Sequence, residues 1–213
     1  MAKLLSIIFL AAFLATALCV TPADLKTLLQ EDGNKFTQDQ LLDFGYHLDN
    51  ALLYIDAFSN INPKVACARK SAFLAQTFLY SKNLAYLEAT DEEGKTYEGR
   101  ADLGNVQPGD GVRYKPRGAY KVVGRKNYQR MSKLFGVNFE EHPEWVSQGN
   151  WVFKLGAAIW KKWDFNFILA NFDSRALRQL YIFDSRPSDL QEVERNVAKL
   201  YEINARARKL FGC

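Results

Sequence analysis

The sequence predicts a mainly α-helical protein with one compact domain. Three observations carry this prediction. Apolar residues recur at helical spacing in several segments, helix caps precede those segments, and glycine and proline gather in one stretch between residues 90 and 120. With 213 residues and 48% hydrophobic content, the chain is long enough for one well-packed core.

The first 19 residues have the layout of a secretory signal peptide. Lys3 supplies a positive charge, an apolar run covers residues 4–17, and small residues follow. The run is short for a membrane span, which needs about 20 apolar residues. We therefore expect cleavage between Ala17 and Val20, an extracellular protein and no membrane association afterwards; an uncleaved anchor is the alternative.

The mature chain, residues 20–213, is expected to fold as a single domain. Predicted helices start at Thr21 and Thr37, where a threonine cap precedes an apolar segment, and a third starts at Asn62-Pro63. The second of these should break near Gly45. The remaining predicted helices cover residues 124–135, a segment opened by 142–143, and residues 151–163, 175–183 and 188–211, the last capped by Ser188.

The region from residue 90 to residue 120 differs from the rest of the chain. Its frequent glycines and prolines predict a long irregular segment with a small β-hairpin. Loops of this length in a compact domain usually carry function or line a cleft.

Cysteine and charge limit the functional classes. Loss of the leader would remove Cys19 and leave Cys67 and Cys213, which are candidates for one disulfide in a secreted chain. The histidines show no metal-ligand spacing with them, so neither a metal nor another cofactor is expected. A net charge of +4, spread along the chain, does not favour nucleic-acid binding, and we expect a monomer.

Five segments, in the right order, resemble the glycoside hydrolase family 19 chitinases and related phage endolysins. The resemblance covers most of the mature chain, from Ala66 to Gly212, and implies a two-lobed helical fold of the lysozyme type with a sugar cleft between the lobes. The segments are AFLAQT (72–77), YEGR (97–100), GDGVRYKPRGAYKVVGRKNY (109–128), HPEWV (142–146) and AAIWKKWDFN (157–166).

The resemblance also implies a mechanism, inverting hydrolysis of β-1,4-linked N-acetylglucosamine polymers. One carboxylic acid protonates the leaving oxygen, and a second carboxylate about 6.5–9.5 Å away activates water. Here Tyr80 occupies the position of the acid, and tyrosine, with a pKa of about 10, is a poor proton donor at neutral pH. Glu88 matches the spacing of the second carboxylate and is the one surviving catalytic candidate, although a solvated residue at a helix end would look the same.

Other positions of the family pattern are lost or kept. Lys121-Val122-Val123 replaces a stretch that positions water and sugar. Ile182-Phe183-Asp184-Ser185 stands where the family has Ile-Asn-Gly-Gly, so the sugar-binding asparagine is lost. Residues that could still bind an amino sugar, by stacking or by hydrogen bonds, are Tyr80, Tyr97, Tyr114, Arg117, Lys121, Asn127 and Arg195.

The sequence therefore favours a secreted, catalytically inactive chitinase-like protein that binds chitin or another N-acetylglucosamine polymer. Two alternatives stay open. One is an active hydrolase that uses non-standard residues, and the other is a secreted scaffold or interaction protein without sugar affinity.

Overall fold

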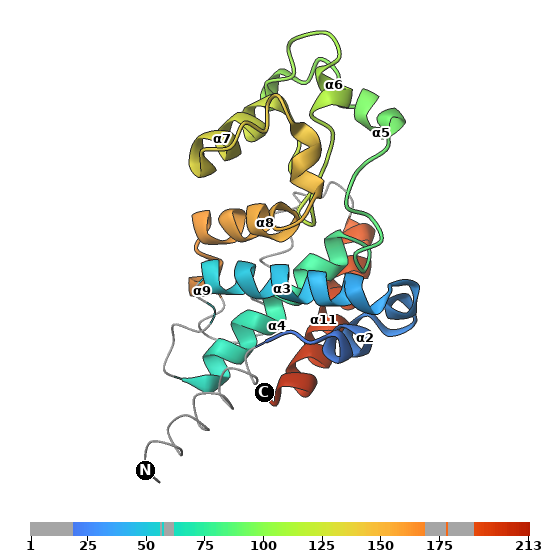
Figure 1. Cartoon of the computed structure of the whole chain (residues 1–213), viewed down its shortest axis with the longest axis vertical. Coiled ribbons are helices and arrows are strands. Elements are labelled where there is room, and N and C mark those ends of the chain that lie inside the picture. The colour runs from blue at the N-terminus through green and yellow to red at the C-terminus, as the bar shows by residue number, and fades with distance from the viewer. Residues whose placement is uncertain (1–18, 56, 58–61, 169–177, 179–189) are drawn as a thin grey trace.

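The computed structural model describes residues 19–55, 57, 62–168, 178 and 190–213. Within these ranges the secondary structure is helical, and the elements form a broad lower lobe and a smaller upper lobe (Figure 1). The α-helices are α2 (Pro22–Leu29), α3 (Gln38–Tyr54), α4 (Pro63–Tyr80), α5 (Asp91–Lys95), α6 (Asp110–Arg113), α7 (Arg125–Phe135), α8 (Trp151–Lys162), α9 (Phe165–Ile168) and α11 (Leu190–Phe211). The 3₁₀ turns are η1 (Gln30–Lys35), η2 (Ala101–Leu103) and η3 (Pro143–Ser147).

The first two helices begin at the expected caps. Thr21 and Thr37 each accept a hydrogen bond from the backbone three residues on, and the side chain at that position returns a bond to the threonine backbone. This capping box satisfies donors that a helix start would otherwise leave unpaired.

The predicted break near Gly45 is wrong, because α3 continues through it. A Cβ atom at Gly45 would lie 2.3 Å from the carbonyl oxygen of Val20. The glycine is therefore explained by the close approach of the N-terminal segment and not by a bend in the helix.

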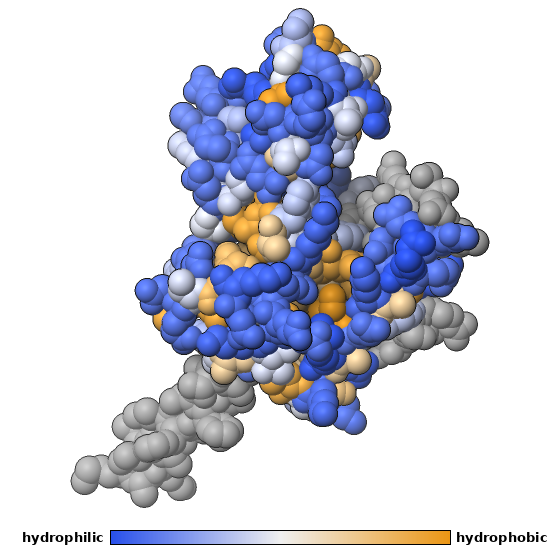
Figure 2. All heavy atoms as spheres, turned by 90° about the vertical axis from the view of Figure 1, so that its right-hand side faces the viewer, coloured by the Kyte–Doolittle hydropathy of each residue, from blue (hydrophilic) through white to orange (hydrophobic). Residues whose placement is uncertain are grey.

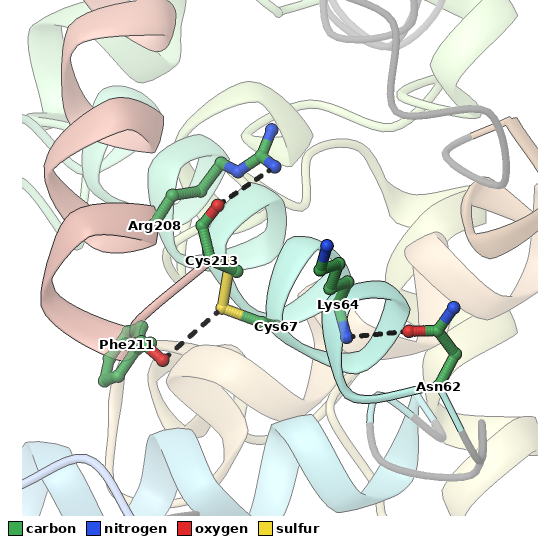
Figure 3. Close-up of a disulfide and its surroundings, with 6 residues drawn as sticks. All are labelled: Asn62, Lys64, Cys67, Arg208, Phe211 and Cys213. Atoms are coloured by element: carbon green, nitrogen blue, oxygen red, sulfur yellow. Dashed lines mark hydrogen bonds between the residues drawn. A yellow bond between two sulfur atoms is a disulfide. The ribbon is translucent and has the colours of Figure 1, made fainter.

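Helix α4 is the centre of the lower lobe. It starts after the Asn62 cap with Pro63 in its first turn, and every residue from Ser71 to Phe78 is buried. Helix α11 packs along it (Figure 1). Beyond α11, the C-terminal Cys213 is disulfide-bonded to Cys67 of α4, as Figure 3 shows.

Two hydrophobic cores share helix α8. Val152, Phe153 and Trp160 belong to the larger core, with α2, α3, α4 and α11. Leu155 and Ala158, on another face of α8, belong to the smaller core of the upper lobe. Helix α8 therefore packs against both lobes and joins their cores.

The glycine-rich region forms short helices and turns instead of a hairpin. In the described chain its only β-type pairing is a set of isolated bridges, from Glu88 to Arg117 and from Arg117 to Val122. The hairpin prediction is wrong because the segment folds into single helical turns, in α5, η2 and α6. The capping box of Thr90 starts α5, and Gly104 in the left-handed conformation ends η2. Helix α7 ends at Gly136 in the left-handed conformation, as expected.

Some expectations lie outside the described residues. These are the signal peptide, of which only Cys19 is described, the helix over 175–183, of which only position 178 is described, the stretch 182–185 and the Ser188 cap. Among the helices that are described, none combines the length and the apolar character needed to cross a membrane.

One close approach sets the junction of the lobes. The ring of Tyr120 lies against Gly156 of α8, where an added Cβ atom would come within 2.1 Å of it. The same ring stacks on Phe73, with the centroids 5.7 Å apart, and meets the Tyr80 ring edge to face at 5.6 Å.

Replacing Gly156 with alanine tests this packing. Alanine favours a helix by about 1 kcal/mol over glycine, but here it must displace Tyr120. We expect Gly156→Ala to lower the free energy of unfolding by about 1–3 kcal/mol in urea denaturation. In a Tyr120→Ala background the same substitution should become neutral or stabilising. A more stable Gly156→Ala protein with Tyr120 intact would contradict this account.

Candidate functional site

Tyr80 is the last residue of α4, and its side chain is half-buried. Its hydroxyl accepts a 3.0 Å hydrogen bond from Nε2 of the buried Gln76, one helical turn earlier. Because the phenol is held on one side by this amide and on the other by the Tyr120 ring, it is a fixed part of the surface around it.

Tyr80 lines an open groove with a volume of about 770 Å³. The groove lies where the end of α4 and the Tyr120 turn meet η1 and the side of α11. Hydrophobic surface is visible in a hollow between hydrophilic elements on the face drawn in Figure 2. The lining residues are Gln30, Asp32, Phe78, Leu79, Tyr80, Lys82, Asn83, Tyr120, Lys121, Glu192, Asn196, Lys199, Glu202, Ile203 and Arg206.

Strained backbone gathers around this groove. Among the described residues, six that are not glycine have a positive φ, and four of them line the groove: Gln30, Lys82, Asn83 and Lys121. Such conformations cost about 1–3 kcal/mol each and cluster at functional sites. Asn83 is further fixed by a 2.8 Å hydrogen bond from its side-chain amide to Asp32.

The groove combines an aromatic floor with polar walls. Its three amide side chains, Gln30, Asn83 and Asn196, can each donate and accept hydrogen bonds, and charged groups of both signs stand beside them. An uncharged, hydroxyl-rich ligand suits such a lining better than a highly charged one. The volume lies within the usual range of about 300–1,000 Å³ for ligand sites.

Glu88 lies apart from this groove and is held by three donors. Its Oε1 atom accepts hydrogen bonds from Arg117 Nε at 3.0 Å and from Lys115 Nζ at 3.1 Å. Its Oε2 atom accepts a 2.9 Å bond from Ser147 Oγ. A carboxylate has about four lone-pair directions, so this arrangement leaves about one for a water molecule.

The surroundings of Glu88 keep it ionised. Partial burial alone would raise its pKa, but the hydrogen bonds from Lys115 and Ser147 and the charge of Arg117 outweigh burial and hold the pKa below its usual value. A lower pKa makes the carboxylate a weaker base. Both cations are buried, and Arg117 also donates to the carbonyl oxygen of Arg113 and to the Tyr128 hydroxyl.

The structure separates the candidate residues that sequence reasoning had grouped. Tyr80 and Lys121 line the groove, whereas Glu88 does not. Burial of Lys121, together with the nearby charge of Lys82, lowers its pKa. Its ammonium lies 5.0 Å from the ring centre of Tyr86.

Three other sequence candidates make contacts within the protein, and burial corrects the prediction for one of them, Tyr114. Tyr114 is 1% exposed and packs on Tyr128 in the upper core, so its ring cannot stack on a ligand. Arg117 is committed to Glu88 and its neighbours. Asn127 donates to the carbonyl oxygen of Val123 and so ties the start of α7 to the preceding turn.

The last two candidates also lie outside the lining of the groove. Tyr97 is half-buried, and its carbonyl oxygen accepts a bond from Asn105 in the glycine-rich region. Arg195 is exposed on α11.

Sequence reasoning missed the contribution of α11. The residues Glu192, Asn196, Lys199 and Arg206 line the groove and are spaced by three, four or seven positions. Such spacing places them on one face of a helix. This polar stripe was visible in the sequence, but its partner surface, η1 and the end of α4, could not be inferred from it.

In the part of the chain that the structure describes, no group of three or more histidine, cysteine, aspartate or glutamate side chains is arranged to hold a metal ion.

Comparison with known proteins places the fold. The sequence matches no family model and no curated protein. Three solved structures are similar: chitinase C from Streptomyces griseus, a mutant of chitinase C, and a bacterial family 19 chitinase. The fold is that of the family 19 chitinases.

The likeness is distant in sequence and extensive in structure. Chitinase C aligns at 18% identity with a TM-score of 0.60, over 78% of this chain and 69% of its own. The mutant of chitinase C aligns at 17% identity with a TM-score of 0.59, over 78% of this chain and 69% of its own. The bacterial family 19 chitinase aligns at 19% and 0.58, over 76% of this chain and 85% of its own. The lysozyme-like helical architecture expected from the sequence is therefore confirmed.

The ion-pair cluster around Glu88 predicts a pH-dependent contribution to stability. Because the folded-state pKa of Glu88 is depressed, its contribution is present above the unfolded pKa of about 4.3 and is lost as the pH falls through the folded value. Glu88→Gln should lower the free energy of unfolding by about 1–2 kcal/mol at pH 7 and by much less near pH 2. The effect at pH 7 is smaller than for a fully buried ion pair because more than a third of this side chain is exposed.

Urea denaturation at both pH values measures this effect. Asp102→Asn is the matched control. Its pair with Arg100 is exposed, so its loss should leave the free energy of unfolding nearly unchanged at both pH values. An equal cost of Glu88→Gln at both pH values would show that the ion pairs are not its cause.

Proposed function

We propose that this chain is a secreted, catalytically inactive chitinase-like protein that binds an N-acetylglucosamine polymer in the groove beside Tyr80. The observation that carries the proposal is the separation of Tyr80 from Glu88. A phenol stands where the resemblance implies the general acid, and the one surviving carboxylate is tied to Arg117, Lys115 and Ser147.

Inverting hydrolysis needs a protonated carboxylic acid on one side of the sugar and a basic carboxylate on the other. Three carboxylates line the groove, Asp32 on η1 and Glu192 and Glu202 on α11, and none lies on α4, which holds the position of the acid. Hydrogen bonds from Asn83 and Lys35 also lower the pKa of Asp32, which keeps it ionised at neutral pH. Glu88, in turn, is a weakened base that does not share a groove with Tyr80.

Sugar binding is supported by the composition of the groove. Pyranose rings present apolar faces that pack on aromatic side chains, and their hydroxyl and acetamido groups need donors and acceptors together. The half-buried Tyr80 ring, which is supported from behind by the buried Tyr120 ring, and the groove amides supply both kinds of contact. The similar solved structures are named as chitinases, which makes N-acetylglucosamine polymers the first ligands to test.

Two assays test the proposal. Mass spectrometry of a hexamer of N-acetylglucosamine incubated with the protein should detect no shorter product. Calorimetric titration with the same hexamer should detect binding, weakened about five- to tenfold by Tyr80→Ala, for a loss of about 1 kcal/mol of aromatic contact. Tyr46→Ala is the control, because Tyr46 is 65% exposed on α3 and lies outside the groove.

The outcomes separate the three hypotheses. Product release that disappears in Glu88→Gln would contradict inactivity and favour a hydrolase with non-standard residues. Absence of any binding heat, together with complete flow-through on insoluble chitin, would contradict sugar binding and favour the scaffold alternative.

A further inference from the structure

Val20 is the first residue of the described chain that is buried in the protein. It is 3% exposed and its side chain belongs to the larger core, whereas the preceding Cys19 is exposed. The Val20 backbone nitrogen donates a 2.9 Å hydrogen bond to Oδ1 of Asp49. The passage from exposed to buried chain therefore falls at the peptide bond between Cys19 and Val20.

Helix α3 makes two contacts with Val20, one through Gly45 and one through Asp49. Gly45 and Asp49 are one helical turn apart and so lie on the same face. The absent side chain of Gly45 admits the Val20 carbonyl oxygen, and the Asp49 carboxylate meets the Val20 nitrogen. Thr21, the next residue, already caps α2. The buried Val20 is therefore followed directly by the cap of the first helix, with no linking residue between them.

Asp49 and the charged side chains around it carry one more negative than positive charge. The groups that act on Asp49 are Lys70 of α4, Asp24 of α2 and the Cys19 thiol. Among the described residues of this cluster, two carboxylates face one ammonium. Burial works against ionised Asp49 and raises its pKa, and it lowers the pKa of Lys70 to about 8. A positive charge at the Val20 nitrogen would balance the cluster.

We propose that a leader peptidase cuts the chain between Cys19 and Val20, and that the new α-ammonium group of Val20 forms an ion pair with Asp49. In the cut, water adds across the Cys19–Val20 peptide bond. Cys19 leaves with the leader as a carboxylate, and the Val20 nitrogen takes up protons to become an ammonium. The amide hydrogen bond present before the cut thereby becomes a charge-assisted bond, which is roughly twice as strong.

Cysteine pairing supports the same position for the cut. The sequence allows cleavage anywhere between Ala17 and Val20, and a cut after Ala17 would leave Cys19 as an exposed thiol. A cut after Cys19 leaves only Cys67 and Cys213, which are bonded to each other. An oxidising compartment favours a chain whose exposed cysteines are all in disulfides.

N-terminal sequencing of the protein secreted from the full-length chain tests the position of the cut. We expect the first residue to be Val20. A first residue of Leu18 or Cys19, any other start, or an intact leader would overturn the proposal, because only an amine at Val20 meets Asp49.

Thermal unfolding tests the ion pair. In the secreted protein, Asp49→Asn should lower the melting temperature by about 5–10 °C, as expected for loss of a partly buried charge partner in a chain of this size. The control is Asp43→Asn, also on α3, whose side chain is 63% exposed and pairs with His47; it should shift the melting temperature by less than about 2 °C.

A second variant keeps the test decisive if Asp49→Asn does not fold. A chain processed to leave Gly-Ser before Val20 keeps the Asp49 side chain but moves the ammonium away. It should melt about 5–10 °C below the protein that begins at Val20, and adding Asp49→Asn to it should have a much smaller effect than in the protein without the extension. An extended protein as stable as the one that begins at Val20 would overturn the ion pair.

Discussion

The buried guanidinium group of Arg117 joins three parts of the upper lobe. It donates to Glu88, to the carbonyl oxygen of Arg113 and to the Tyr128 hydroxyl, while its backbone bridges both Glu88 and Val122. A buried cation needs partners, and Glu88 supplies the anion that compensates it. Glu88, the surviving catalytic candidate of the sequence analysis, is therefore part of the framework that holds Arg117. The position of the loop that carries Tyr120, and with it one wall of the groove, depends on that framework.

The groove depends in turn on contacts between small and large residues. Gly156 gives the Tyr120 ring its place on α8, and the ring then packs on Phe73 and Tyr80. The strained turn at Lys82 and Asn83 follows directly and brings their side chains to the groove. Most of the unfavourable backbone conformations therefore lie around a surface rich in hydrogen-bonding groups, as expected of a binding site.

Much of the fold could be predicted from local sequence. The caps Thr21, Thr37 and Asn62 and the stop at Gly136 act within a few residues, so they are visible in the chain alone. Long-range packing was not visible. Gly45 was interpreted as a break because its neighbour in space, Val20, is 25 positions away in the sequence. Burial of Tyr114 and the part of α11 in the groove were missed for the same reason, since both depend on which distant surface each element meets.

One NMR experiment tests the central claim, that the groove binds an amino-sugar polymer without cleaving it. We expect a hexamer of N-acetylglucosamine added to ¹⁵N-labelled protein to shift the amide signals of Tyr80, Asn83 and Lys121 and to leave those near Glu88 in place. The spectrum of the hexamer should stay unchanged for days. Appearance of signals from new reducing ends, or absence of shifts at the groove, would contradict this claim.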